Sequence, residues 1–389
     1  MAGSTTLILG GGVGGIVTAN TLRTLLPKEH RIALVSKTPS MHLGATQTWV
    51  MMGERQPRQV TRSFDALKRR GIDLYDSEVR RINAETREVV TENATLKRDF
   101  LVVALGADLN LGAIDGLDRA AESFYTMEGA LKLREQLKAW KGGDLVFLNP
   151  RMPIKCPPAP YEAAMLIEHD LKRRGLRDQT RMSFYTIEPA PIPTAGPTMG
   201  TFVRGALAER NIALHTQKQL KSVDATRKLL TFADGSEVKY DLLIAVPPHE
   251  APRVARDSGL ARGGWIPVDP RTMKTSAPQV FALGDVTAVP LPGRYKPEAP
   301  LMLPKAAVFA EAQGRIVAGQ IAAQVLGKEP KELFEGNGFC YLELGDHHAM
   351  VGEGNFYATP QPSITMQLPG MAAHDAKRKW VDDWMRANL

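Results

Sequence analysis

The sequence predicts an α/β fold with two Rossmann-like domains, β-meander insertions and a small C-terminal α+β region. Three observations lead to this prediction. A strand, a glycine-rich loop and a helix open the chain at residues 5–26, a second strand, loop and helix recur at residues 144–174, and a buried strand ends in Gly284-Asp285. The 389 residues are enough for two or three domains with complete cores.

Composition narrows the class of protein. An apolar fraction of 43% and a charged fraction of 23% are typical of an ordinary soluble globular protein. We find no apolar run of about 18 residues, the length of a membrane span, and no signal peptide before the first strand. The net charge of +7 is spread along the chain without a nucleic-acid motif. We therefore expect a solvated basic surface, with anionic lipid or substrate as the alternative and no nucleic-acid partner.

Only two cysteines are present, Cys156 and Cys340. They are too few for a disulfide scaffold, a Cys-rich zinc site or an iron–sulfur site, so no metal is expected. The two cysteines are therefore either two unrelated buried thiols or one redox-active pair.

The N-terminal unit carries a dinucleotide-binding fingerprint. The first strand runs into Gly10-Gly-Gly12-Val-Gly14-Gly15, and a helix is expected over Ile16–Leu26. Gly10 permits the tight turn, Gly12 lets the backbone approach a pyrophosphate, and Gly15 lets helix and strand pack closely. The helix N-terminus attracts the phosphate charge. We expect a domain of the FAD/NAD(P)-binding type, with these four glycines at the cofactor.

The second strand of this domain, Arg31–Val35, ends at Ser36-Lys37, where an acidic residue usually binds the ribose hydroxyls. A serine can still hydrogen-bond a ribose, but the change weakens a plain NAD assignment. We place Ser36 and Lys37 at the cofactor.

Three further segments complete the first part of the domain. Residues 71–76 and 78–82 are expected as a short strand pair, and 88–90 with 95–97 as a hairpin in an inserted meander. A buried strand over 99–106 ends in Ala-Leu-Gly. The cofactor contacts expected from this part are Val79, Ala104 and Gly106.

The middle of the chain repeats the pattern of strand, loop and helix, but its loop contains no glycine. After a helix over 128–140 and a strand over 145–148, residues 150–160 contain five prolines and Cys156, and a helix follows over 161–174. Such a loop is stiff and gives few backbone donors for a phosphate. The unit is expected to continue with strands at 182–187, 212–216 and 242–246, a helix at 201–209, a meander at 223–240 and a crossing at Pro247-Pro248.

The later part returns to the first domain. In Gly284-Asp285 the carboxylate can accept a hydrogen bond from the ribityl hydroxyls of a flavin, and the glycine allows close approach, so we expect FAD. Lys305 precedes a helix expected over 306–326, and a helix N-terminus with a lysine suits the electron-rich O2/N1 edge of a reduced flavin. A solvated lysine is the alternative.

The C-terminal region is expected to hold a strand over 334–344 with Cys340, short strands at 349–352 and 364–366, and a helix from about 374. The adjacent His347 and His348 point to different sides, so we expect surface residues, with a proton relay as the alternative. Domain bounds are expected at 1–106 with 250–328 for the FAD-binding domain, 107–249 for the second domain and 329–389 for the C-terminal region.

These motifs resemble those of sulfide:quinone oxidoreductases and of the flavoprotein subunit of flavocytochrome c sulfide dehydrogenase. Cys156-Pro-Pro-Ala-Pro-Tyr-Glu162 is similar to the cysteine loop of that family, and Asp170–Asp178 continues it. Residues 36–53 resemble the quinone-reductase branch, whereas Val246-Pro-Pro and residues 264–269 resemble the flavocytochrome branch. The similarity covers essentially the whole chain.

The resemblance implies a redox pair of Cys156 and Cys340 beside a non-covalently bound FAD, with Cys340 nearer the flavin. It also implies Lys305 at the flavin ring and Glu162 near the cysteines as catalytic residues. Hydrosulfide would attack the disulfide and leave a persulfide and a thiolate. Lys155 is expected to favour the Cys156 thiolate if its side chain turns the same way.

The sequence also departs from the family. Tyr125 stands where many quinone reductases have a third cysteine, and Gly129 and Thr194 stand where they have histidines. These changes argue against building long polysulfides and against histidine-assisted proton transfer. The long membrane-inserting tail is largely missing, and the terminal helix is expected either on a lipid surface or packed on the protein.

The resulting hypothesis is sulfide oxidation with hydrogen sulfide or a small sulfur species as donor and a quinone as acceptor, in the cytoplasm and peripheral to the inner face of the membrane. The alternatives are a c-type cytochrome acceptor, which requires a periplasmic location, an NAD(P)H-dependent flavoprotein, and a non-enzymatic redox sensor. The sequence leaves a homo-oligomer open.

Overall fold

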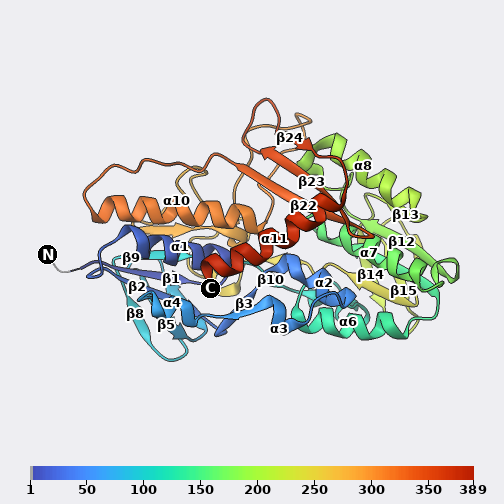
Figure 1. Ribbon diagram of the computed structural model, residues 1–389, viewed down its shortest axis with the longest axis horizontal. Coiled ribbons are helices and arrows are strands. Elements are labelled where there is room, and N and C mark those ends of the chain that lie inside the picture. The colour runs from blue at the N-terminus through green and yellow to red at the C-terminus, as the bar shows by residue number, and fades with distance from the viewer. Residues whose placement is uncertain (1–2) are drawn as a thin grey trace.

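The computed structural model describes residues 3–389, and its centre is formed by two parallel sheets that lie end to end (Figure 1). The predicted α/β class with two Rossmann-like units is confirmed. The C-terminal strands and helix lie across the middle of the molecule, where the two units meet (Figure 1).

The first sheet has the strand order β20-β9-β1-β2-β5, with all neighbours parallel. Successive residues of β1 enter different cores, Ile8 on one face and Leu7 and Leu9 on the other. Burial on both faces is the reason why these strands read as continuous apolar runs. The elements of this sheet are β1 (Thr5–Leu9), α1 (Val13–Leu25), β2 (Arg31–Ser36), β5 (Asp73–Asp76), β9 (Phe100–Val103), β20 (Val280–Ala282) and α10 (Ala307–Val325).

Helices α1 and α10 pack directly on each other over this sheet (Figure 1). Their close approach needs glycine, because a Cβ on Gly314 would lie 2.8 Å from the carbonyl oxygen of Gly14. The contact brings the N-termini of both helices to the same edge of the sheet.

One strand pairing predicted from the sequence is wrong. Residues 73–76 join the large sheet beside β2, whereas residues 79–83 form β6 and pair with β7 in the meander. Both segments are short and alternate weakly, so their sequence does not specify a partner. The smaller elements are β3 (Ser40–His42), α2 (Gln47–Met52), α3 (Pro57–Val60), β4 (Thr61–Ser63), α4 (Asp65–Arg69), β6 (Val79–Asn83), β7 (Glu88–Thr91), β8 (Thr95–Lys97), α9 (Arg253–Arg256), β19 (Ile266–Pro267) and β21 (Thr287–Ala288).

The second sheet has the order β13-β12-β11-β17 and is also parallel. Helix α8 begins at Gly196, five residues before the expected start, because Pro197 occupies its first turn, where proline is favoured. The elements are α5 (Leu117–Ala120), α6 (Met127–Ala139), β11 (Gly143–Asn149), α7 (Ala159–Arg173), β12 (Thr180–Thr186), α8 (Gly196–Glu209), β13 (Ile212–His215), β14 (Leu220–Asp224), β15 (Leu229–Phe232), β16 (Glu237–Lys239) and β17 (Leu242–Ala245). The two segments that cross between the sheets, β10 (Asp108–Leu109) and β18 (His249–Glu250), pair with each other.

The C-terminal region is an antiparallel sheet, β22 (Asn337–Gly345), β23 (His348–Asn355) and β24 (Ser363–Met366), followed by α11 (Met371–Asn388). Val381, Trp384 and Met385 of α11 are buried in the core that also contains α1. Of the two placements left open by the sequence, this apolar face packs on the protein body. No helix of residues 3–389 combines the length and the apolar character needed to cross a membrane.

Candidate functional site

A cavity lies where the three regions meet. Its lining comes from the N-terminus of α1, the segment 41–48, the end of β9, the proline loop, the end of β20, the start of α10, strand β22 and helix α11. The site residues predicted from the sequence that line it are Gly12, Gly14, Ala104, Gly106, Cys156, Glu162, Gly284, Asp285, Lys305 and Cys340.

The glycine loop forms one wall of the cavity. Gly12 is the N-cap of α1. No side chain caps this helix, so the N–H groups of its first turn are available to a ligand. A Cβ on Gly12 would meet no atom within 4 Å, whereas one on Gly15 would lie 2.0 Å from the carbonyl oxygen of Gly10. Gly12 thus leaves room for a ligand and Gly15 allows the helix to pack on the strand, which is the arrangement that binds a pyrophosphate.

The end of β20 forms the adjoining wall. Gly284 donates its backbone N–H to the side-chain oxygen of the buried Gln313 (2.8 Å), which fixes the turn. Asp285 is half-buried beneath the cavity, and burial raises the pKa of its carboxyl against the opposing pull of Lys305 and Lys155. In residues 3–389 no side chain or backbone N–H donates to this carboxylate, so it can accept hydrogen bonds from the hydroxyls of a flavin. The lining fits the predicted cofactor.

Five of the predicted cofactor residues do not line the cavity: Gly10, Gly15, Ser36, Lys37 and Val79. Gly10 and Gly15 shape the loop from behind, and Ser36 sits behind it as well, since a Cβ on Gly11 would lie 2.6 Å from the Ser36 Oγ. Val79 is buried in the core between the sheet and the meander, and the Lys37 side chain is exposed. Direct contact of Val79 with a cofactor stays a prediction.

Both cysteines face this cavity, from different regions of the chain. Cys156 has a left-handed backbone (φ 51°), and its N–H donates to the carbonyl oxygen of Lys305 (2.7 Å). Cys340 lies on β22, opposite Gly352. Both thiols are free, and they are near enough for Cys340 to raise the pKa of Cys156.

The reduced thiols are held in their protonated form. Burial is the main cause of the raised pKa of Cys340, about 12, and the Glu162 carboxylate adds to it while Lys377 opposes it. Burial, Cys340 and Glu162 raise the pKa of Cys156 in the same way, again against Lys377. A base is therefore needed to form the thiolate.

The expected role of Lys155 is supported in part. Lys155 lines the same cavity as Cys156; burial lowers its pKa, and the charge of Cys156 opposes this. Its Nζ lies 6.0 Å from the centre of the Tyr125 ring, and its charge adds to burial in lowering the pKa of His42 and His249. Lys377 of α11 also favours the Cys156 thiolate.

Lys305 lines the cavity, and its contact with a flavin ring stays a prediction. Its Nζ donates to the carbonyl oxygens of Asp285 (2.7 Å) and Thr287 (2.9 Å) and lies 3.6 Å from the centre of the Trp265 ring. Burial lowers its pKa to about 8. Its ammonium group thus holds the end of β20 in place beside the cavity.

Glu162 is joined to a buried cluster that the sequence did not reveal. Its Oε1 accepts hydrogen bonds from Lys377 Nζ (2.9 Å) and Thr48 Oγ1 (2.7 Å). Lys377 also pairs with Glu343 (3.4 Å), whose other carboxylate oxygen bonds His374 Nδ1 (2.9 Å). Lys377 reads in the sequence as part of a basic run, and only its spacing from His374 and Val381 places it on the buried helix face.

His249 gives a prediction about pH. Its Nδ1 bonds the Pro247 carbonyl oxygen (2.7 Å) and its ring lies edge-on to Tyr125. Burial, with Lys155, lowers its pKa from 6.5 to about 3. Because the unfolded chain takes up this proton first, the stabilisation is complete above pH 6.5 and is lost as the pH falls towards 3, by about 1.4 kcal/mol per pH unit.

His249→Gln should therefore flatten the loss of stability between pH 7 and pH 5, measured by urea unfolding. The loop histidine His348, changed in the same way, is the control and should leave the slope unchanged. Equal slopes in the wild type and His249→Gln would contradict this assignment.

The edge of the second sheet lacks a phosphate site. The Tyr161 hydroxyl donates to Glu188 Oε2 (2.6 Å), and the Tyr161 ring stacks on Phe184 with centroids 4.5 Å apart. Asn149 and Thr186 also donate to Glu188, which is 1% exposed. Buried side chains thus fill the place at the carboxyl ends of β11 and β12 where a second dinucleotide would bind.

Comparison with known proteins agrees with this arrangement. Sulfide:quinone oxidoreductase from Mus musculus mitochondria is 24% identical over 373 residues, 91% of this chain and 78% of that protein. Sulfide-quinone reductase from Aquifex aeolicus is 25% identical over 366 residues, with 91% and 83% covered. The X-ray structure of the Aquifex aeolicus sulfide:quinone oxidoreductase superposes with a TM-score of 0.89 at 23% identity, over 99% of this chain and 91% of that one.

The model of one protein family matches most of the chain, at residues 4–148 and 156–314, which include the glycine loop, Cys156 and Asp285. Together with the flavoprotein fold and the cavity between the two units, this match makes the protein an oxidoreductase. The chain belongs to the pyridine nucleotide-disulphide oxidoreductase family.

Proposed function

We propose that this protein is an FAD-dependent sulfide oxidoreductase that uses Cys156 and Cys340 as a redox pair and passes the electrons to a quinone. The observation that carries the proposal is that both cysteines line the same cavity as the glycine loop and Asp285. The resemblance of the proline loop and the names of the relatives support sulfide as the donor.

The residues of the chain perform the sulfur chemistry in three steps. Hydrosulfide attacks one sulfur of the disulfide, so the old S–S bond breaks and a persulfide and a thiolate form. A second hydrosulfide attacks the outer sulfur of the persulfide and leaves with it as a disulfide anion, HSS⁻, so that the second cysteine is also released. The two cysteines then return to the disulfide and give up two electrons.

FAD, held by Gly12, Gly14, Gly106 and Asp285, would supply the two-electron acceptor for that last step. Glu162 lines the same cavity as both cysteines, and its charge raises the pKa of both, so we assign it the role of the base that takes the thiol proton. We assign Cys340 to the flavin side, as the resemblance implies.

Aromatic side chains support a quinone as the acceptor. Phe339, Tyr341 and Trp380 line the cavity on the side of β22 and α11, with ring centroids 5.6 Å and 5.8 Å from Phe339 to the other two. Aromatic rings pack against another flat ring in offset-stacked or edge-to-face contacts, so this wall can hold the ring of a quinone.

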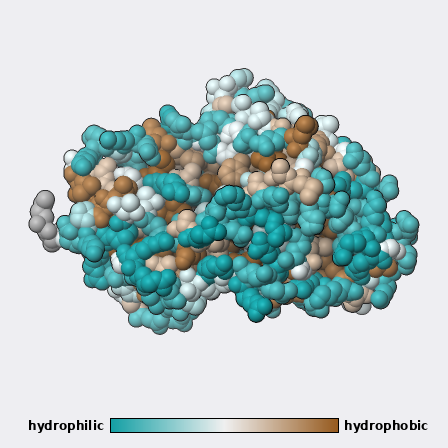
Figure 2. All heavy atoms as spheres, in the orientation of Figure 1, coloured by the Kyte–Doolittle hydropathy of each residue, from teal (hydrophilic) through white to brown (hydrophobic). Residues whose placement is uncertain are grey.

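Two exposed apolar side chains at the start of α11 support contact with a membrane surface, which we place on the cytoplasmic side. Leu368 and Met371 are 91% and 59% exposed. On the face drawn in Figure 2 hydrophobic residues form separate groups in a mainly hydrophilic surface.

The test is an anaerobic titration of the oxidised flavin. Stoichiometric sulfide should bleach its absorbance, and NADH should leave it unchanged because Tyr161 and Glu188 fill the second dinucleotide site. Bleaching by NADH and not by sulfide would overturn the proposal. Turnover with a short-chain quinone and with cytochrome c, compared in parallel, decides the acceptor.

A further inference from the structure

The buried cluster beside the cysteines contains an unbalanced charge. Glu162, Glu343, Lys377 and His374 are each at most 4% exposed. Two carboxylates face one ammonium group, so a fully ionised cluster with a neutral histidine would carry one negative charge in the interior. Burying such a charge costs several kcal/mol, about the effective penalty for one ion. A proton that passes into the cluster would remove this cost.

The cluster is continuous from the cavity to the surface. Lys377 bridges Glu162 (2.9 Å) and Glu343 (3.4 Å), and Glu343 bonds His374 Nδ1 (2.9 Å). The ring of His374 lies edge-on to that of His347, with centroids 5.2 Å apart, and His347 is exposed in the turn between β22 and β23.

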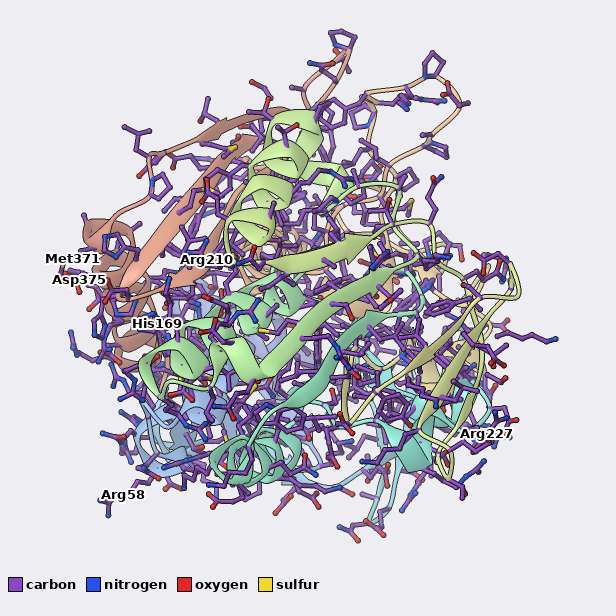
Figure 3. The ribbon with its side chains drawn as sticks, turned by 90° about the vertical axis from the view of Figure 1, so that its right-hand side faces the viewer. Arg58, His169, Arg210, Arg227, Met371 and Asp375 are labelled. Carbon is purple, nitrogen blue, oxygen red and sulfur yellow. The ribbon has the colours of Figure 1, made fainter. Side chains whose placement is uncertain are left out.

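Other groups surround the outer end of the cluster. Glu54, which follows α2, is influenced by Glu343, His374, Arg378 and His347, and burial is the main cause of its raised pKa. The start of α11 lies at the edge of the molecule, where Figure 3 labels Met371 and Asp375. Trp49 Nε1 donates to Glu343 Oε1 (3.1 Å) and holds that carboxylate in place.

We propose that Lys377, Glu343, His374 and His347 form a proton path between the cysteine pocket and solvent, with Glu162 at its inner end. The inference rests on the proposed function. Closing two thiols into a disulfide removes two electrons and two protons from the sulfur atoms. With a flavin as acceptor both electrons and one proton leave for its ring, so one proton leaves the pocket in this step. The thiolates that hydrosulfide releases take up one proton from outside in the earlier steps, so protons have to cross between the pocket and solvent in both directions in each cycle.

The chemistry of the members suits this task. Glu162 receives the thiol proton, and the hydrogen bonds through Lys377 and Glu343 pass a proton on to His374. An imidazole accepts on one nitrogen and donates from the other, which makes histidine a proton shuttle. His347 then releases the proton to water.

The first experiment uses two neighbouring histidines. His347→Ala should slow sulfide-driven flavin bleaching about tenfold in stopped flow, less than the roughly hundredfold or more that a positioned acid or base supplies, because water partly replaces the ring. Added imidazole should restore the rate. His348→Ala is the matched control, because the His348 Nδ1 bonds the Asp346 carbonyl oxygen and the residue is not part of the path. This variant should bleach at the wild-type rate, with or without imidazole.

The second experiment needs no sulfide. In the reduced holoprotein, Glu162→Gln removes the negative charge that, after burial, raises the pKa of both thiols. Their alkylation by iodoacetamide at a fixed pH of about 8 should become about tenfold faster, in line with one pKa unit. His347→Ala should leave alkylation unchanged.

The outcomes separate the two proposals. Bleaching of His347→Ala at the wild-type rate, with no imidazole effect, overturns the proton path and leaves sulfide oxidation standing. No bleaching of the wild type by sulfide, with faster alkylation in Glu162→Gln, overturns sulfide oxidation and supports the coupling of the cluster to the thiols. Unchanged alkylation in Glu162→Gln overturns that coupling.

Discussion

Cys340→Ser is expected to lower the rate of sulfide-driven flavin reduction by at least about a thousandfold, because removal of a covalent catalyst removes the whole route. Cys156→Ser should have the same effect, since the disulfide needs both sulfur atoms. Both thiols are free in the structure and both line the cavity, so neither variant should disturb the glycine loop. Stopped-flow absorbance of the flavin under anaerobic conditions measures the rate.

The control is the cofactor itself. Both variants should retain FAD through purification, and dithionite should reduce it as in the wild type. A serine variant that is bleached by sulfide within tenfold of the wild-type rate would contradict the role of the pair in sulfide oxidation.

Lys377→Met is expected to lower the free energy of unfolding by about 3–5 kcal/mol, because it leaves the buried Glu162 and Glu343 carboxylates without their cation. The lysine side chain is 3% exposed, and the two carboxylate side chains are 5% and 2% exposed. Urea unfolding at neutral pH measures the change.

Two further variants serve as the control and as a test of rescue. Lys379→Met, two positions along the same helix, removes a lysine whose side chain is 76% exposed and which pairs only with Asp383, so it should cost under about 1 kcal/mol. Adding Glu343→Gln to Lys377→Met should recover part of the loss, because it removes one of the unpaired charges. Equal losses for Lys377→Met and Lys379→Met would show that the cluster does not hold the helix.

The sequence predicts the parts of the site that depend on local backbone geometry. The glycine loop, the proline loop and Gly284-Asp285 each follow a buried strand, and the carboxyl ends of parallel strands meet at one edge of a sheet. Their convergence on one cavity could therefore be expected. Cys340 could be paired with Cys156 only through the family resemblance, since nothing in the spacing of the two cysteines brings them together.

Side-chain direction within irregular segments could not be predicted. Lys155 follows the same loop as Cys156 yet points towards Tyr125, and Lys305 folds back onto two carbonyl oxygens. Both outcomes depend on the turn that each backbone takes. Lys377 and His374 escaped notice for a different reason, because charged residues on a terminal helix normally face solvent and here their partners come from α7 and β22.

The hydrogen bond from the Cys156 N–H to the Lys305 carbonyl oxygen joins the two units and so affects how they can move. Cys156 belongs to the second unit and Lys305 to the first, and the neighbouring Lys155 forms a strand bridge to Lys305 as well. The two units are thus fastened together beside the reacting sulfur atoms. If one unit rocks against the other, the pivot lies at this fastening and the outer rims move most. The distance from Cys156 to the first unit would then stay nearly constant while the rims open to admit and release small molecules.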